Sequence, residues 1–256
     1  MCSRLCAVLP LLLLAGCSVL EDRDQCPCHL VFDFSDEANC CADSISVALQ
    51  AGAYSSSFVV GSADYGIPVK VDVPSRNELN VNALDASTAV LDRDGRLTIS
   101  EGEQCPQTYM FTSRCDISAE DAFVYVKLHK NYCGISVSFS SPSPDLYDMV
   151  VSGNVCGYSN DGMPLPGRFS YSPSFDESSM SFFCIPRQID GSLKLGIRYG
   201  EGPVRYFALG NYILESGYDW SKEDLDDIVV SIDYAATEIR ITVDDWSIEE
   251  EYDVVI

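Results

Sequence analysis

Residues 122–140 read AFVYVKLHKNYCGISVSFS, a run in which apolar and polar residues alternate almost throughout. Alternation with a period of two is typical of a half-buried β-strand, because successive side chains of a strand point to opposite faces of the sheet. The run is too long for one ordinary strand, which has about 3–10 residues. We therefore predict two strands hinged at residues 129–131, the last strand of one domain and the first strand of the next.

Outward from this run, short alternating segments recur about every ten residues. They are separated by turn pairs such as Asp94-Gly95, Asp161-Gly162 and Asp190-Gly191. About sixteen such strands and almost no helical periodicity predict an all-β fold, and one β-sandwich uses about seven to nine strands, so two tandem sandwiches are expected. One short helix is expected at Ser221–Asp227, where Ser221 can cap the free backbone amides. No repeat period is visible along the chain.

These features divide the chain into four parts. They are a signal peptide (1–16), a tether (17–25), an N-terminal β-sandwich domain (26–130) and a C-terminal β-sandwich domain (131–256). The boundary between the two domains has an allowance of about fifteen residues either way. The Pro-Ser-Pro turn at 142–144 is the alternative place for this boundary.

The N-terminus has the features of an exported lipoprotein. Arg4 precedes the apolar run Leu5–Leu14, which as a helix is about 15 Å long, half of a bilayer core. The run therefore predicts an export signal and not a membrane span. Residues 14–17 read Leu-Ala-Gly-Cys, which matches a bacterial lipobox, so Cys17 is the predicted lipid attachment site. The alternative is an ordinary signal peptide followed by an incidental cysteine.

The charge balance excludes some partners. There are 16 Lys and Arg against 39 Asp and Glu, a net charge of −23. Binding to a phosphate backbone requires cations, so we expect no nucleic-acid partner, and adsorption to anionic lipid is disfavoured for the same reason. The two histidines, His29 and His129, leave little material for histidine-based catalysis or zinc ligation.

The 12 cysteines agree with export to an oxidising compartment. Cys2 and Cys6 lie in the leader and Cys17 takes the lipid, which leaves an odd number, so at least one is unpaired. The first four of the remaining cysteines form either disulfides or a zinc cluster, but their C-x-C and C-C spacing disfavours zinc. The disulfide candidates are Cys26 and Cys28 against Cys40 and Cys41, Cys105 with Cys115, and Cys133 with Cys156, with Cys184 left over.

No catalytic or metal-binding pattern emerges, so we expect no enzyme, no catalytic residue, no metal and no cofactor. Residues 92–95 begin like a calcium loop, but Arg96 takes the place of the third ligand. Paired acidic residues at 226–227 and 244–245 are adjacent, so on a strand they point to opposite faces. Trp220 and Trp246 are candidates for a platform on which sugar rings stack. The alternative is that they pack in the core or at the rim of a sandwich, where aromatic side chains are also common.

Three segments, in chain order, suggest a family. They are the mature start, with Cys17, an acidic stretch and Cys26-Pro27; the run Val124–Val137; and the close, Ile239–Trp246. Together they resemble the FimB-like fimbrial anchor lipoproteins of Bacteroidetes, the minor fimbrillins of type V pili. The resemblance implies two tandem transthyretin-like β-sandwich domains, a base-of-pilus role and no enzymatic activity. It also implies a lipid-anchored place on the outer membrane.

The same resemblance implies partners. Fimbrial subunits join by β-strand addition, in which main-chain hydrogen bonds give affinity and alternate side chains fill pockets. An anchor keeps its lipidated N-terminus, so its C-terminus is the natural donor, and Tyr252, Val254 and Ile256 alternate as a donor strand requires. The alternative is a last strand that pairs within its own chain. A surface glycan-binding lipoprotein of a polysaccharide-uptake system is the second functional hypothesis.

Overall fold

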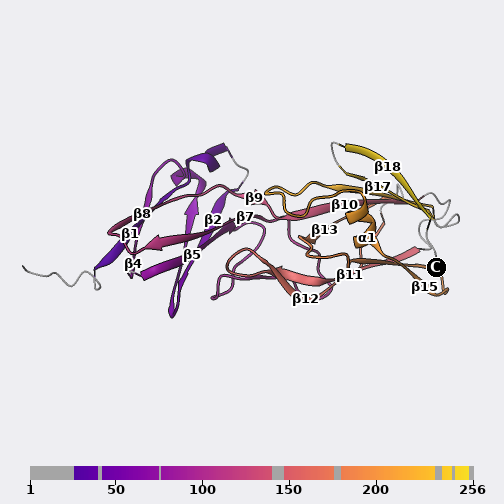
Figure 1. Cartoon of the computed structure of the whole chain (residues 1–256), viewed down its shortest axis with the longest axis horizontal. Coiled ribbons are helices and arrows are strands. Elements are labelled where there is room, and N and C mark those ends of the chain that lie inside the picture. The colour runs from indigo at the N-terminus through magenta and orange to yellow at the C-terminus, as the bar shows by residue number, and fades with distance from the viewer. Residues whose placement is uncertain are drawn as a thin grey trace, which may run out of the picture.

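The computed structural model describes residues 26–39, 42–74, 76–139, 147–175, 180–233, 238–243 and 246–253. They form an elongated molecule, with the N-terminal half at one end and the C-terminal half at the other (Figure 1). Each half has a hydrophobic core that collects residues from two sheets. The predicted fold class, an all-β protein built of sandwiches, is confirmed.

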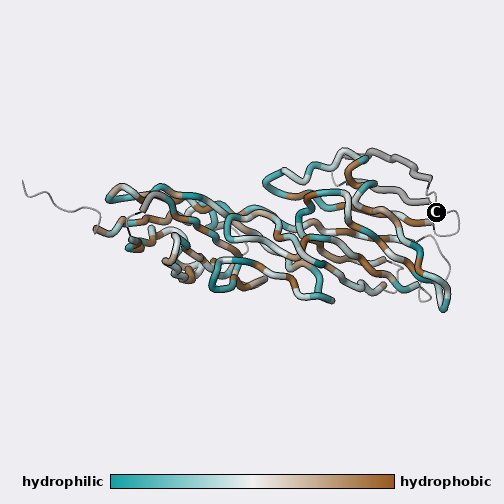
Figure 2. Tube along the Cα trace, turned by 60° about the horizontal axis from the view of Figure 1, so that its bottom comes forward, coloured by the Kyte–Doolittle hydropathy of each residue, from teal (hydrophilic) through white to brown (hydrophobic). Residues whose placement is uncertain are grey.

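The first half combines a three-stranded sheet, β4-β1-β8, with a five-stranded sheet, β3-β2-β5-β7-β9. β1 pairs antiparallel with β4 and parallel with β8. Hydrophobic and hydrophilic residues alternate along these strands (Figure 2), so that Leu30, Phe32, Val47 and Leu49 reach the core. The strands are β1 (Pro27–Asp33), β2 (Ser44–Ala51), β3 (Tyr54–Gly61), β4 (Val69–Pro74), β5 (Arg76–Asp85), β7 (Tyr109–Ile117), β8 (Asp121–Tyr125) and β9 (His129–Lys130).

The second half repeats this arrangement with the sheets β13-β10-β16-β17-β18 and β12-β11-β14-β15. β10 pairs antiparallel with β13 and parallel with β16, as β1 does with β4 and β8. The helix α1 (Leu209–Glu215) buries Leu209 and Ile213 in the second core. The strands are β10 (Tyr132–Phe139), β11 (Tyr147–Tyr158), β12 (Pro164–Tyr171), β13 (Met180–Pro186), β14 (Lys194–Tyr199), β15 (Val204–Phe207), β16 (Ile228–Asp233), β17 (Glu238–Val243) and β18 (Trp246–Asp253).

The alternating run that joins the halves is broken at residues 126–128 and again at Asn131, whereas the predicted hinge residues His129 and Lys130 form the short strand β9. β8 belongs to the first half and β10 to the second, and the short β9 between them pairs with β7. Two 3₁₀ turns, Ser35–Asn39 and Ser62–Asp64, complete the first half. No helix in the described part of the chain is long and apolar enough to cross a membrane.

Between β5 and β7 the chain leaves the first half and packs on the second. β6 (Leu97–Thr98) pairs with β11, and Ile99 and Cys105 are buried in the second core. The predicted N-terminal unit, 26–130, did not include this crossing, because alternation shows that a segment is a strand but not which core it joins. The division into two domains at that boundary stays a prediction.

The predicted helix at Ser221–Asp227 is wrong, since these residues form turns and irregular chain. The backbone amide and hydroxyl of Ser221 both donate to the Asp219 carboxylate, at 2.8 and 2.6 Å. Ser221 therefore closes a local turn instead of capping a helix. The α-helix among the described residues lies earlier, at α1 (Leu209–Glu215), and begins after Ala208 without a side-chain cap.

Candidate functional site

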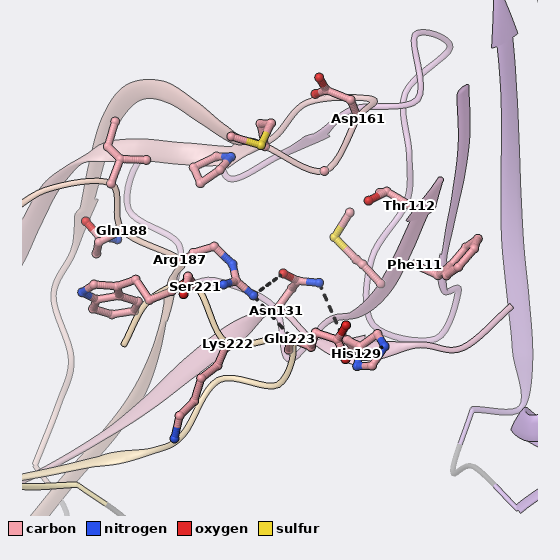
Figure 3. Close-up of a pocket in the computed structure, with 16 residues that line it drawn as sticks. Phe111, Thr112, His129, Asn131, Asp161, Arg187, Gln188, Ser221, Lys222 and Glu223 are labelled. Carbon is pink, nitrogen blue, oxygen red and sulfur yellow. Dashed lines mark hydrogen bonds and ion pairs between the residues drawn. The ribbon is translucent and has the colours of Figure 1, made fainter. Parts of the chain in front are cut away.

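A cleft of about 650 Å³ lies where the two halves meet (Figure 3). The first half contributes Met110–Thr112 of β7. His129 and Asn131 come from the linking segment, residues 126–131 between β8 and β10. The second half contributes three loops, at 161–164, 187–189 and 220–223. The cleft therefore follows the junction along which the two halves are held together.

Arg187 is the centre of this junction. Its guanidinium donates to the main-chain oxygens of Trp220 and Glu223 and, through Nη2, to Asn131 Oδ1 at 3.1 Å (Figure 3). Its main-chain N–H donates to the Tyr158 hydroxyl at 2.8 Å, and that hydroxyl donates to the Asn131 carbonyl oxygen. Burial raises the pKa of Tyr158, so the phenol stays neutral and can donate. Arg187 therefore holds the side chain of Asn131, and Tyr158 holds its main-chain carbonyl group.

Two carboxylates of the second half hold the linking segment on its other side. Asp224 accepts from the Lys130 main-chain N–H at 2.8 Å and lies 3.1 Å from His129 Nδ1. Asp227 accepts from Lys130 Nζ and from the Gly134 main-chain N–H, both at 2.6 Å. Charge-assisted hydrogen bonds of this kind are shorter and stronger than neutral ones. The chain between the halves is thus fastened along its length.

The negative charge of Asp224 strengthens its hydrogen bonds to the linking segment. Burial opposes its ionisation, but the hydrogen bonds from Lys130 and His129 and the nearby positive charges prevail and lower its pKa. Of the polar side chains that line the cleft, those of His129, Asn131 and Arg187 are engaged in holding the junction. In the described part of the chain, no three His, Cys, Asp or Glu side chains are grouped for a metal ion.

The predicted disulfide partners are spread over both cores. Cys17, Cys40 and Cys41 lie outside the described residues. Seven cysteines are described, all with free thiols: Cys26, Cys28, Cys105, Cys115, Cys133, Cys156 and Cys184.

Cys105 and Cys115, and Cys133 and Cys156, are not joined in the structure, and the predicted pairing of Cys26 and Cys28 with Cys40 and Cys41 stays a prediction. Cys105 is buried in the second core, whereas Cys115 packs against the first. Cys133 is buried in the second core, and the half-buried Cys156 thiol donates to the Leu165 carbonyl oxygen at 3.7 Å. Spacing in the sequence paired Cys105 with Cys115, but the topology places these two residues in different cores.

The predicted donor strand is described only in part. Tyr252 lies on β18, opposite Ile239 of β17, while Val254 and Ile256 lie outside the described residues. β18 is the last strand of its sheet and pairs with β17 alone among the described strands. The C-terminal strand is therefore self-paired, the alternative that the sequence left open, and is held by a single neighbour.

Trp220 forms no exposed platform, and the side chain of Trp246 lies outside what the structure describes. Trp220 packs against Tyr218, with ring centroids 4.5 Å apart, and both contact the second core. Exposed aromatic side chains stand elsewhere, on strands at the margin of a sheet: Phe123 and Tyr125 on β8, and Phe182 on β13. Sequence reasoning did not single out these side chains or Arg187, because no local motif marks them. It gave Asn131 and Asp224 other roles, in a hinge and in the first turn of a helix.

No family model matches the chain, and no curated protein matches it. Solved structures do match. The fimbrial anchor protein Mfa2 of Porphyromonas gingivalis aligns with a TM-score of 0.60 at 14% identity, over 88% of this chain and 100% of that chain. The chain has the fold of a fimbrial anchor protein.

Two further structures share this fold. A candidate polysaccharide-binding protein of Bacteroides thetaiotaomicron aligns with a TM-score of 0.63 at 9% identity, over 90% of this chain and 99% of that chain. A candidate adhesin of Bacteroides ovatus aligns with a TM-score of 0.57 at 12% identity, over 87% and 95% of the two chains. The likeness extends over nearly the whole of each protein, so the resemblance to minor fimbrillins is confirmed at the level of the fold.

Proposed function

We propose that the protein is a lipid-anchored accessory subunit of a fimbria, which attaches the pilus to the outer membrane. The observation that carries this proposal is the fold shared with Mfa2 over nearly the entire chain. The lipobox at residues 14–17 supports it independently, since it supplies a membrane attachment at Cys17. We expect no enzymatic role, because both observations point to an interaction protein.

The shape of the molecule suits an anchor. β1 begins at Pro27, shortly after Cys17 in the sequence, and lies in the half opposite to β15 and β18 (Figure 1). A pilus attached to the far half would pull on the lipid through the junction between the halves. Arg187, Asp224 and Asp227 fasten that junction by hydrogen bonds and ion pairs, so a load would pass from one half to the other without the linking segment extending.

Assembly by strand addition completes the proposal. β18 forms the margin of its sheet and pairs with β17 alone among the described strands. Its release would break one ladder of main-chain hydrogen bonds, which an acceptor subunit would replace with an equivalent ladder. Tyr252, Val254 and Ile256 would supply the alternating side chains of the donor.

Replacing the lipidated cysteine tests the anchor. Cys17→Ala should leave fimbriae assembled but shed into the medium, because the base loses its membrane attachment. Cys26→Ala is the matched control, since Cys26 is an exposed cysteine close to Cys17 in the sequence. Fimbriae that stay on cells carrying Cys17→Ala, measured by immunoblotting of cell and medium fractions, would contradict the anchor.

A C-terminal deletion tests strand addition separately. Removing residues 252–256 should leave lipidation and folding intact and detach fimbriae from an anchor that remains on the cell. Circular dichroism and thermal unfolding of the purified variant control for loss of the fold. Fimbriae of normal length and normal attachment would refute the C-terminal donor while leaving the anchor proposal standing.

A surface glycan-binding lipoprotein is the second candidate, favoured by the shared fold of the candidate polysaccharide-binding protein. Calorimetric titration with bacterial and host oligosaccharides tests it directly. Oligosaccharide binding, together with fimbriae that stay on cells carrying Cys17→Ala, would favour glycan binding over the fimbrial role.

A further inference from the structure

Three cysteines are buried together in the second core. Cys105, Cys133 and Cys184 are each at most 1% exposed and belong to one hydrophobic cluster. Cys105 comes from the segment between β5 and β7 that crosses from the first half, whereas Cys133 lies on β10 and Cys184 on β13. A bond from Cys105 to either of the others would therefore connect a first-half insertion to a second-half strand.

The backbone places Cys105 beside Cys184. The Cys105 main-chain N–H donates to the Cys184 carbonyl oxygen at 3.0 Å, and the Cys184 N–H donates to Gln104 Oε1 at 3.2 Å. One main-chain and one side-chain hydrogen bond thus hold residues 104–105 against the margin of β13. Residues of adjacent strands that are joined by main-chain hydrogen bonds have Cα atoms about 5.5 Å apart, which lies inside the range of about 4.4–6.8 Å that a disulfide spans.

The third cysteine is directed elsewhere. In the register of β10 and β13, Cys184 stands opposite Gly134, and Cys133 stands opposite Ile185. Successive positions along a strand point to opposite faces, so the side chains of Cys133 and Cys184 leave this strand pair on different sides. The thiols themselves do not separate the two candidates, since Cys133 is hydrogen-bonded with Tyr218 and Cys184 with Gln107. Cys184 is accordingly the partner that the main chain presents to Cys105.

We propose that Cys105 and Cys184 form a disulfide in the exported protein. One S–S bond replaces two S–H bonds, and the two electrons reduce the disulfide of a thiol–disulfide oxidoreductase to a dithiol that carries the two protons. The proposal rests on the proposed function to the extent that export supplies this oxidant. It replaces the predicted partner of Cys105 and gives a partner to the cysteine that the sequence left over.

The bond forms while the chain folds. Burial raises the pKa of Cys105 well above its usual range and that of Cys184 to about 11, and the thiolate is the reactive form. The closed core therefore suppresses the reaction, and the oxidant must act before the core closes. The resulting link gives the halves a second covalent connection besides the linking segment.

Peptide mapping tests the pairing. The exported full chain is alkylated during lysis, digested without reduction and analysed by mass spectrometry. We expect a linked peptide pair with Cys105 and Cys184, and alkylated Cys105 in Cys184→Ala. Cys156→Ala is the matched control and should keep the linked pair. Cys105 linked to Cys133, or both Cys105 and Cys184 alkylated in lipidated protein, would overturn the proposal.

Thermal unfolding gives a second readout. Cys184→Ala should lower Tm by about 10 °C under oxidising conditions, since closing a long loop stabilises a protein by constraining its unfolded state. After reduction with dithiothreitol, the variant and the wild type should differ far less. An equal difference in Tm with and without reductant would mean that the substitution only perturbs packing, and would count against the bond.

Failure of export can be separated from failure of the pairing. A protein without lipid on Cys17 and with free thiols throughout would contradict the proposed function. The same full chain, refolded in a mixture of oxidised and reduced glutathione, then tests the pairing alone. A Cys105–Cys184 link in the refolded protein supports the pairing, and free thiols in folded protein refute it.

Discussion

The two halves of the molecule have the same seven-strand plan and differ in their insertions. The order β4-β1-β8 in one half corresponds to β13-β10-β16 in the other, and β3-β2-β5-β7 corresponds to β12-β11-β14-β15. The first strand of each half lies between an antiparallel and a parallel neighbour. The seven shared strands form the core of each half. The insertions, which the two halves do not share, are therefore the segments to compare at the junction.

The insertions meet at the junction. In the first half the insertion follows β5 and carries β6 and Cys105 onto the second core. In the second half it follows β15 and carries α1 and the loop whose Asp224 and Asp227 hold the linking segment. Two repeated units are thus fastened to each other by the parts in which they differ. The junction is therefore a packed and hydrogen-bonded interface, and not only a linker between two domains.

The largest expected effect comes from blocking the crossing of the first insertion. Gly157 of β11 has φ of +145°, and a Cβ there would lie 2.0 Å from the Leu97 carbonyl oxygen. Gly157→Ala should destabilise the protein by about 3 kcal/mol or more, through backbone strain and separation of β6 from β11. Urea unfolding followed by circular dichroism measures this change.

A glycine elsewhere provides the control for that substitution. Gly61 has an ordinary φ of −84°, and a Cβ added to it would meet no atom within 4 Å. Gly61→Ala should therefore change stability by less than about 0.5 kcal/mol. Equal effects of Gly157→Ala and Gly61→Ala would show that the crossing of β6 adds nothing to the stability of the fold.

Removing the central arginine should have the next largest effect. Arg187→Ala deprives Trp220, Glu223 and Asn131 of a charged donor in a partly buried place, which should cost about 2–3 kcal/mol. Arg198→Ala is the matched control, because Arg198 pairs with Asp148 in an exposed position and should cost less than about 1 kcal/mol. Similar urea midpoints for the two variants would mean that the junction contributes no more than a surface ion pair.

The smallest effect concerns the charge of Asp224. Its side chain is 62% exposed, so solvent screening limits the loss in Asp224→Asn to less than about 1 kcal/mol. Because its pKa is lowered in the folded protein, the stabilisation is present above the unfolded value of about 3.9 and is lost as pH falls through the folded pKa. Unfolding from pH 7 downward should therefore show wild type and variant converging in acid.

The exposed Glu103→Gln serves as the control for this titration. Its difference from the wild type should stay small at every pH. If the gap between Asp224→Asn and the wild type stayed constant into acid, the carboxylate of Asp224 would not be acting through its charge.

Much of the fold could be predicted from local patterns. Alternation over residues 122–140 predicted two strands with a break at 129–131; the structure has β8 and β10, with the short strand β9 at residues 129–130 between them. The helix prediction at Ser221–Asp227 was wrong because Ser221 closes a turn with Asp219, and Asp224 binds the linking segment. A capping motif depends only on its own neighbours in sequence, while Asp224 binds His129 and Lys130, 95 and 94 residues away.

The candidate site was less accessible to sequence analysis. Arg187 and Asn131 carry no motif, and their contact exists only because two distant loops meet. The partner of Cys105 was out of reach for a related reason: spacing favoured Cys115, but the segment that contains β6 carries Cys105 to the other core. Proximity in sequence predicts contact only within one element or one hairpin.

By itself the sequence determined the class of the fold, the positions of most strands and the strand break between the halves, because the two faces of a strand impose a period of two on its own residues. It showed no repeat, and the tertiary structure alone revealed that the two halves share one plan. Strand order, the crossing of β6 and the grip of Arg187 on Asn131 depend on which segments pair across the chain. Such pairing is a property of the packed whole, since any alternating strand satisfies a core equally well until its neighbours are fixed.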